Sequence, residues 1–351
     1  MANMAQAVRM ALHYAEAHLG VTDIFGEDVG PPLGGIFTCT QGLTTTWGTP
    51  LDERGIIGAA MGIAMAGGRP VAEIQFCDYI YNTIDLLKLA GSTHWSSNGE
   101  WNLPMVVMTP VGSGIRGSLY HSHSFDASAT HLPGWKTVMP SNPLDAYGLL
   151  LSACKETNPV FFLVPKALMR VRGEDNIPGA PADERALSKL IDAPLGDRSA
   201  WSAKWPSLED PEIPIGKAKI VREGSRLTVV SYGRTLPLCV QAANALAEDG
   251  LDAEVIDLRT LWPYDWKCLS ESIEKTGRVL YVNEDTEVTN FGEHLVRRTV
   301  EELFYKLHAP PKLLAGKFVP GIGLADVLEM ASVPQLDDIS HAIRTLAALE
   351  P

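Results

Sequence analysis

The sequence lacks the patterns that identify several common classes of enzyme. No G-x-G-x-x-G motif follows the first predicted strand and no G-x-x-x-x-G-K-[ST] motif occurs, so a dinucleotide site and a P-loop are both without support. The G-x-S-x-G turn of many hydrolases is also missing. Positive charge is scarce, with 29 Lys and Arg against 42 Asp and Glu, and a net charge of −13 makes nucleic acid an unexpected partner.

The cysteines are dispersed and form no C-x-x-C pair: Cys39, Cys77, Cys154, Cys239 and Cys268. An odd, scattered set indicates reduced thiols in an intracellular compartment. No apolar run is long enough to cross a bilayer, and the first residues run into helical periodicity without the regions of a signal peptide. We therefore expect no membrane association and a cytoplasmic protein, with a mitochondrial matrix protein stripped of its transit peptide as the alternative.

Helix and strand patterns alternate over residues 1–170. Periodicity predicts strands at 71–76, 105–109, 136–139 and 160–164, and helices at 5–19, 53–67, 79–95 and 143–156. The helix at 53–67 is apolar on every side, so we expect it to be buried. This alternation predicts an α/β domain with a largely parallel sheet covered by helices on both faces.

The alternation stops over residues 171–214, where six prolines and many charges surround one helical pattern at 184–191. We interpret this segment as a linker with an ordered insertion, whose Trp201 and Trp205 cover a core edge or pack on a partner. Residues 215–351 regain periodicity, with strands at 227–231, 253–258 and 278–283 and helices at 236–248, 266–275, 291–307 and 338–349. They predict a second, smaller α/β domain.

Two segments place polar side chains where chemistry is feasible. In T-P-L-D-E-R-G at 49–55, Asp52 as an N-cap and Glu53 as a first-turn acid already have a structural explanation. In E-I-Q-F-C-D-Y at 73–79, Gln75 ends an apolar strand and Tyr79 follows it. Ligands bind at the carboxyl ends of strands in open α/β sheets, although a satisfied strand end with core aromatics explains this pattern equally well.

A third segment is rich in histidine. R-G-S-L-Y-H-S-H-S-F-D at 116–126 contains His121 and His123, and His131 follows. A metal cluster is one interpretation, but no later group of ligands completes a site. A loop that presents His121 as a proton-transfer group or hydrogen-bond donor fits better.

Taken in order, these segments resemble the β subunits of the first component of 2-oxo acid dehydrogenases over nearly the whole chain. The motifs that carry the resemblance are F-G-E-D-V-G (25–30), G-G-I-F (34–37), the Asp52-Glu53 segment, E-I-Q-F-x-D-Y (73–79), Y-H-S (120–122), H-L-P-G-W-K-x-V-M-P-S (131–141), N-P-V-F-F (158–162), V-I-D-L-R-T-L-x-P-x-D (255–265) and K-T-G-R (275–278). Two of them, E-I-Q-F-x-D-Y and Y-H-S, are most similar to the branched-chain members, with the pyruvate enzymes as the near alternative.

The resemblance implies a pyrimidine-binding domain of the thiamine diphosphate type with a parallel sheet, followed by a transketolase C-terminal-like α/β domain. It implies oxidative decarboxylation of a 2-oxo acid, of the 3-methyl-2-oxobutanoate type, and reductive acylation of a lipoyl group on an acyltransferase core. Glu53 would hydrogen-bond N1′ of the cofactor's aminopyrimidine, and Leu51, Gln75 and Tyr79 would line its pocket. His121 would assist acyl transfer to the lipoyl arm.

The family holds the diphosphate and Mg²⁺ with a G-D-G segment and a later Asn, which this sequence lacks. The resemblance therefore implies that an α subunit holds Mg²⁺, in an α2β2 heterotetramer. Family members often carry a potassium-binding loop at the position of S-A-C-K-E-T-N-P (152–159). Glu156 and Asn158 fit that loop as potassium ligands, whereas a hydroxyl expected near Val106 is absent.

One departure leaves the substrate open, because His123-Ser-Phe-Asp stands where the family usually has Gln-Ser-Pro-Glu. Two other classes of function remain as alternatives. A non-catalytic scaffold that binds the acyltransferase core through the acidic C-terminal domain is disfavoured by the retention of Glu53, Gln75, Tyr79 and His121. A self-contained transketolase-type enzyme is disfavoured by the missing G-D-G segment.

Overall fold

The computed structural model describes residues 1–194, 196–198 and 200–350. The chain divides into two compact units, the first made of Met1–Pro110, His131–Val164 and Leu168–Ile215, the second of Val111–Thr130, Pro165–Ala167 and Gly216–Pro351. Leu195 and Ser199 of the expected insertion and Pro351 of the expected C-terminal domain lie outside the described residues. The domain limits at 1–170, 171–214 and 215–351 stay a prediction.

The first unit is built on a parallel sheet. Its strands lie in the order β5-β6-β4-β3-β1-β2, and the pairs β1–β2, β1–β3, β3–β4 and β5–β6 are parallel. The strands are β1 (Asp23–Gly26), β2 (Thr46–Gly48), β3 (Pro70–Glu73), β4 (Val106–Val111), β5 (Lys136–Val138) and β6 (Val160–Pro165). The predicted parallel sheet is confirmed.

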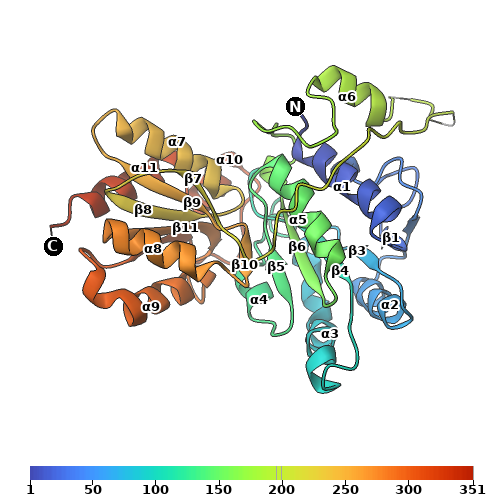
Figure 1. Ribbon diagram of the computed structural model, residues 1–351, viewed down its shortest axis with the longest axis horizontal. Coiled ribbons are helices and arrows are strands. Elements are labelled where there is room, and N and C mark those ends of the chain that lie inside the picture. Colours follow the sequence, from blue (N-terminus) through green and yellow to red (C-terminus); the bar gives the residue numbers. More distant parts are fainter. Residues whose placement is uncertain (195, 199, 351) are drawn as a thin grey trace. The chain divides into compact units, whose positions relative to one another are not determined.

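Helices cover both faces of this sheet, with α1 beside α5 on one face and α2 and α3 on the other (Figure 1). The helices are α1 (Met4–His18), α2 (Glu53–Met65), α3 (Ile84–Ser96), α5 (Pro143–Lys155) and α6 (Glu184–Ile191), with 3₁₀ turns η1 (Ile36–Thr38), η2 (Cys77–Thr83) and η3 (Lys166–Leu168). The helix predicted at 79–95 therefore begins as a 3₁₀ segment, which ends where the Thr83 hydroxyl donates to the Ile80 carbonyl at 2.6 Å.

Only one face of α2 is buried, so the prediction of burial on every side is wrong for the described chain. Its buried residues are Ile56, Ile57, Ala60, Met61 and Ala64. The opposite face carries Gly58, Gly62 and an exposed Met65, and added Cβ atoms at the two glycines would meet nothing within 4 Å. Apolar composition predicts that a helix face avoids water, but not which chain covers it.

The insertion packs on the first unit. The Trp205 ring stacks on His13, with centroids 4.1 Å apart, and lies against the core that α1 and α5 share. Arg9 of α1 donates to the Ile191 carbonyl at 2.8 Å and pairs with Asp192 at 2.9 Å. For Trp205, covering a core edge is the interpretation that the structure supports.

The second unit is built on a smaller sheet with strand order β12-β11-β8-β9-β7, parallel except for the antiparallel pair β7–β9. Helices α7 and α11 cover one face and α8 and α9 the other (Figure 1). The elements are α4 (Asp126–Thr130), β7 (Lys219–Arg222), β8 (Leu227–Ser231), α7 (Thr235–Ala247), β9 (Ala253–Asp257), β10 (Thr260–Trp262), α8 (Trp266–Thr276), β11 (Val279–Thr286), α9 (Phe291–Leu303), η4 (Phe304–Lys306), β12 (Lys312–Gly316), α10 (Asp326–Ser332) and α11 (Leu336–Ala347). Among the described residues, no helix has the length and apolar character needed to span a bilayer.

Candidate active site

Glu53 stands in the first turn of α2, where the sequence predicted it. Asp52 caps the helix, with its Oδ1 accepting from the Gly55 amide at 2.9 Å. The neighbouring Arg54 pairs with Asp85 of α3, Nη1 to Oδ1, at 2.6 Å. The cap and the ion pair fix this turn, so the Glu53 carboxyl lies at the positive end of the helix dipole.

A second carboxyl and an amide face Glu53. The Asn82 side chain donates to Glu53 Oε2 at 3.0 Å. Glu27, in F-G-E-D-V-G after β1, lies close enough to Glu53 that burial, together with the Glu53 charge, raises the pKa of Glu27 to about 7. Both carboxyl oxygens of Glu27 are buried and have no hydrogen-bond partner within the described residues. Neither Glu27 nor Asn82 was among the predicted site residues.

Gln75 and Tyr79 lie beside this pair. The Gln75 amide donates to the Asp28 carboxylate, and Phe76 and Tyr79 form an edge-to-face aromatic pair with centroids 6.2 Å apart. Burial, and then the charges of Asp78, Glu27 and Glu53, raise the pKa of Tyr79, so its hydroxyl lies within their field. Leu51, the fourth predicted pocket residue, is 85% exposed.

A third carboxyl, Glu73, lies behind these groups and is 1% exposed. Both its oxygens accept from the Ile36 amide at 3.2 Å. Burial raises the pKa of Glu73 to about 8, although the Ile36 bond opposes the shift. Gly35 has φ of 67°, and a Cβ there would lie 2.9 Å from Glu73 Oε2, so glycine suits this position. Glu27, Glu53 and Glu73 form what we call the first carboxyl cluster.

His121 lies in the second unit, whereas Leu51, Glu53, Gln75 and Tyr79 lie in the first. Its Nδ1 is 3.0 Å from the Gly117 carbonyl, and its amide donates to the Ser118 carbonyl at 3.3 Å. A ring that donates from Nδ1 keeps Nε2 as its acceptor when neutral. The loop therefore sets the tautomer of His121.

A glycine loop before His121 matches the G-x-G-x-x-G spacing at 112–117, which sequence analysis did not consider. No helix follows it directly, since Arg116 and Ser118 have φ of 56° and 62°. The Ser113 amide donates to Glu284 at 3.1 Å and the Gly114 amide to Glu329 at 2.7 Å. These backbone amides therefore donate to carboxylates of the chain itself, whereas in a dinucleotide site they would donate to a phosphate.

A second carboxyl cluster, made of Asp126, Glu284 and Asp285, lies in the second unit. Asp126 is 1% exposed, and burial together with the charge of Asp285 holds its pKa well above the ordinary value. Asp285 accepts from the Ala127 amide at 3.0 Å, and burial raises its pKa as well. The Tyr232 hydroxyl faces Asp126, and burial raises the pKa of Tyr232.

The predicted potassium ligands follow α5. The Glu156 carboxylate pairs with Lys136 at 2.6 Å, and Asn158 Oδ1 is buried without a hydrogen-bond partner in the described part of the chain. No group of three or more His, Cys, Asp or Glu side chains within the described residues is arranged to hold a metal ion.

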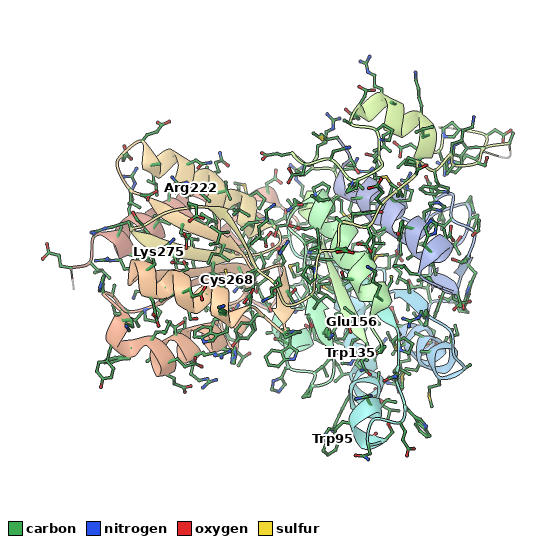
Figure 2. The ribbon with its side chains drawn as sticks, in the orientation of Figure 1. Trp95, Trp135, Glu156, Arg222, Cys268 and Lys275 are labelled. Atoms are coloured by element: carbon green, nitrogen blue, oxygen red, sulfur yellow. The ribbon has the colours of Figure 1, made fainter. Side chains whose placement is uncertain are left out.

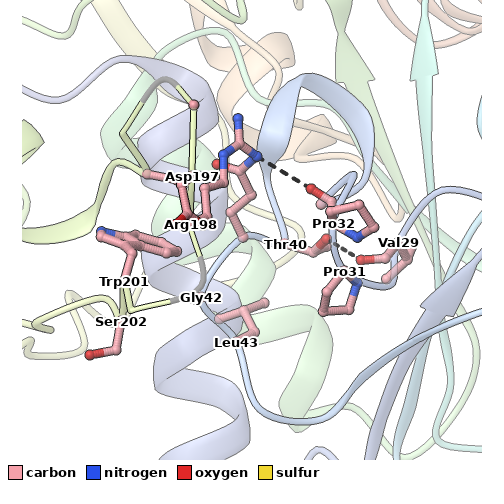
Figure 3. Close-up of a pocket in the computed structure, with 14 residues that line it drawn as sticks. Val29, Pro31, Pro32, Thr40, Gly42, Leu43, Asp197, Arg198, Trp201 and Ser202 are labelled. Atoms are coloured by element: carbon pink, nitrogen blue, oxygen red, sulfur yellow. Dashed lines mark hydrogen bonds between the residues drawn. The ribbon is translucent and has the colours of Figure 1, made fainter.

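A cavity of about 720 Å³ lies elsewhere in the first unit, between the loops around residues 29–43 and 193–202 (Figure 3). Arg198 donates to the Pro32 carbonyl at 3.3 Å and Thr40 to the Val29 carbonyl at 2.8 Å beside it. Its lining contains none of the predicted site residues.

Comparison with known proteins identifies two family domains along the chain. The family model of the transketolase pyrimidine binding domain matches residues 1–172, and that of the transketolase C-terminal domain matches residues 216–339. A solved structure titled "Split gene transketolase, inactive beta4 tetramer" covers all of both chains with a TM-score of 0.73 at 17% identity. The predicted pair of domains is confirmed.

Individual relatives show which transketolase-like proteins this chain resembles. The 2-oxoisovalerate dehydrogenase subunit beta of Bacillus subtilis is 37% identical over 92% of each chain, and that of Pseudomonas aeruginosa is 40% identical over 90% of this chain and 87% of its own. The pyruvate dehydrogenase E1 component subunit beta of Acholeplasma laidlawii is 34% identical over 99% of this chain and 98% of its own. The chain therefore belongs to the family of β subunits of thiamine-diphosphate-dependent 2-oxo acid dehydrogenases.

Proposed function

We propose that this chain is the β subunit of a branched-chain 2-oxo acid dehydrogenase and that its first unit holds the aminopyrimidine half of thiamine diphosphate. The observation that carries the proposal is the Glu53 carboxyl at the start of α2, which Asn82 holds by a hydrogen bond and whose charge acts on the buried Glu27. Gln75, Tyr79 and Leu51 add polar and apolar side chains around it, and this combination fits an aminopyrimidine ring.

The side chains around Glu53 have separate tasks. Glu53 would hold a proton at the N1′ position of the bound ring, and Asn82 donates to its Oε2 and so fixes the carboxyl. Glu27 could take up or release a proton beside Glu53, because its pKa of about 7 lies close to neutral pH. Thiamine diphosphate, when bound, supplies the carbanion-stabilising chemistry by which a 2-oxo acid loses carbon dioxide.

A partner α subunit holds the diphosphate and Mg²⁺ in this proposal, in an α2β2 assembly. The curated relatives are named as beta subunits, and the sequence has no G-D-G segment. The first unit also exposes large apolar side chains, including Leu51, Met65, Trp95 and Trp101. Exposed apolar side chains of this size indicate a surface that another chain covers.

His121 is assigned to the later acyl transfer to a lipoyl group on the acyltransferase core. The Gly117 carbonyl accepts from Nδ1, so Nε2 is the atom that would donate a proton to the thiolate released when the lipoyl disulfide opens. Glu156 and Asn158 are candidate potassium ligands by resemblance only.

The test is steady-state decarboxylation by the chain co-expressed with its α subunit, comparing 3-methyl-2-oxobutanoate with pyruvate. We expect a higher kcat/KM for the branched acid. Preference for pyruvate would favour the second candidate, a pyruvate dehydrogenase β subunit, which the Acholeplasma laidlawii relative supports. Bound cofactor without turnover of either acid would support the non-catalytic scaffold.

A further inference from the structure

The two carbonyl groups at the end of α5 share one donor. The Cys154 and Glu156 carbonyl oxygens lie 3.1 and 3.0 Å from the same atom, Arg69 Nη1. Both belong to the segment at 152–159 that resembles a potassium-binding loop. Backbone carbonyl oxygens are the groups that replace the hydration shell of a bound potassium ion.

Other carbonyls of the segment also accept from backbone amides. The Ala153 carbonyl accepts from the Glu156 amide at 3.2 Å. The Thr157 carbonyl accepts from Leu103 at 3.1 Å, and the Pro159 carbonyl accepts from Lys136 at 3.1 Å. These oxygens are held by the fold around α5 and β6.

A second cation neutralises the carboxylate of the segment. Lys136 Nζ lies 2.6 Å from Glu156 Oε1, and both side chains are partly buried. Figure 2 places Glu156 at the end of α5 in the first unit. Val106, at the start of β4, is buried and has no hydroxyl to offer an ion.

Arg69 is held in place to make its contacts. Its amide donates to Thr22 Oγ1 at 3.1 Å, and the Thr22 amide donates to its carbonyl at 3.1 Å, directly before β3. A guanidinium stays charged at any physiological pH. At the C-terminal end of α5 that charge also complements the helix dipole.

We propose that Arg69 is the resident cation of the 152–159 segment, so that this chain ties β3 to the end of α5 without a potassium ion. Arg69 donates to two carbonyls and Lys136 neutralises Glu156, which together replace the charge and the coordination that an ion would provide. Glu156 then serves as the ion-pair partner of Lys136, while Asn158 Oδ1 stays buried without a hydrogen-bond partner among the described residues. This inference does not depend on the identity of the substrate.

The test is thermal unfolding of the purified full chain in potassium, sodium, lithium or choline chloride at a constant ionic strength of about 0.15 M, where screening is equal. We expect the wild-type Tm to agree within about 1 °C in all four salts. Equilibrium dialysis with rubidium, an ion close to potassium in size, should detect no stoichiometric binding.

A variant pair tests Arg69 itself. Arg69→Met should lower Tm by roughly 3–6 °C, because two charge-assisted hydrogen bonds are lost. Arg185→Met, at an exposed position on α6, should change Tm by no more than about 1 °C.

A potassium-specific rise in the wild-type Tm of several degrees, or one rubidium ion bound per chain, would overturn the proposal. Equal Tm changes in the two variants would overturn it as well. If Arg69→Met fails to fold, the wild-type salt series and the rubidium dialysis still test whether the 152–159 segment binds an ion.

Discussion

The two carboxyl clusters of this chain are chemically alike but lie in different surroundings. In the first, Glu53 is partly exposed at the start of a helix, beside an exposed Leu51. In the second, Asp126 and Asp285 are buried, and Tyr232 and the Ala127 amide face them. Both clusters raise pKa values by burial, so a raised pKa alone does not identify a site. Access for a ligand separates a catalytic cluster from a structural one.

The largest effect should come from Glu53. Glu53→Ala in the αβ complex should lower decarboxylation by about 10²–10⁴-fold, the usual contribution of a positioned proton-transfer group. Size-exclusion chromatography should show the assembly intact. Turnover near that of the wild type would contradict a catalytic role for Glu53 and so for the first carboxyl cluster.

A smaller and selective effect is expected for His121 in the second unit. His121→Ala should lower lipoyl acylation by about 10²-fold, while decarboxylation with an artificial electron acceptor falls by less than about tenfold. Both assays use the same αβ preparation. Equal losses in the two assays would contradict a role in acyl transfer.

The raised pKa of Glu73 should make the free energy of unfolding depend on pH. Its folded pKa, about 8, lies above the ordinary 4.5, so its contribution to stability is fully present below pH 4.5 and is lost as pH rises through 8. Glu73→Gln keeps an acceptor for the Ile36 amide and should reduce the fall in unfolding free energy by up to about 1.4 kcal/mol per pH unit in that range. Denaturant titrations at several pH values measure this slope, and an unchanged slope would contradict the assignment.

The smallest effect on activity should come from the second carboxyl cluster. Asp126→Asn removes a carboxyl whose raised pKa makes the folded state less stable as pH rises above the ordinary 3.8. The variant should gain about 1–2 kcal/mol of unfolding free energy near neutral pH. Its decarboxylation should stay within about twofold of the wild type. A loss as large as that of Glu53→Ala would make the second cluster catalytic.

The sequence predicted the longer elements well, because their apolar periodicity is sustained. The helix predicted at 184–191 is α6, and the strand predicted at 227–231 is β8, each with the same limits. The strands β2 and β12 were missed, since T-W-G is too short to show a period and K-L-L-A-G, though as long as β8, does not alternate between apolar and polar residues. Pairing with β1 and β11 makes them strands.

The candidate site was predicted in part, and by resemblance rather than by pattern. Tyr79 lies near Glu53, since the charges of Glu27 and Glu53 raise its pKa. Gln75 lies in the same region, where its amide donates to Asp28. Glu27 was missed because the parallel pairing of β1 with β3 decides which carboxyl lies near the strand ends. Such pairing joins residues far apart in sequence, and no local pattern records it.

The central claim is that this chain provides only the aminopyrimidine half of a cofactor site. Calorimetric titration of thiamine diphosphate with Mg²⁺, into the chain alone and into the αβ complex, tests it most directly. We expect saturable binding to the complex and none to the lone chain. Saturable binding to the lone chain with the affinity of the complex would contradict the claim.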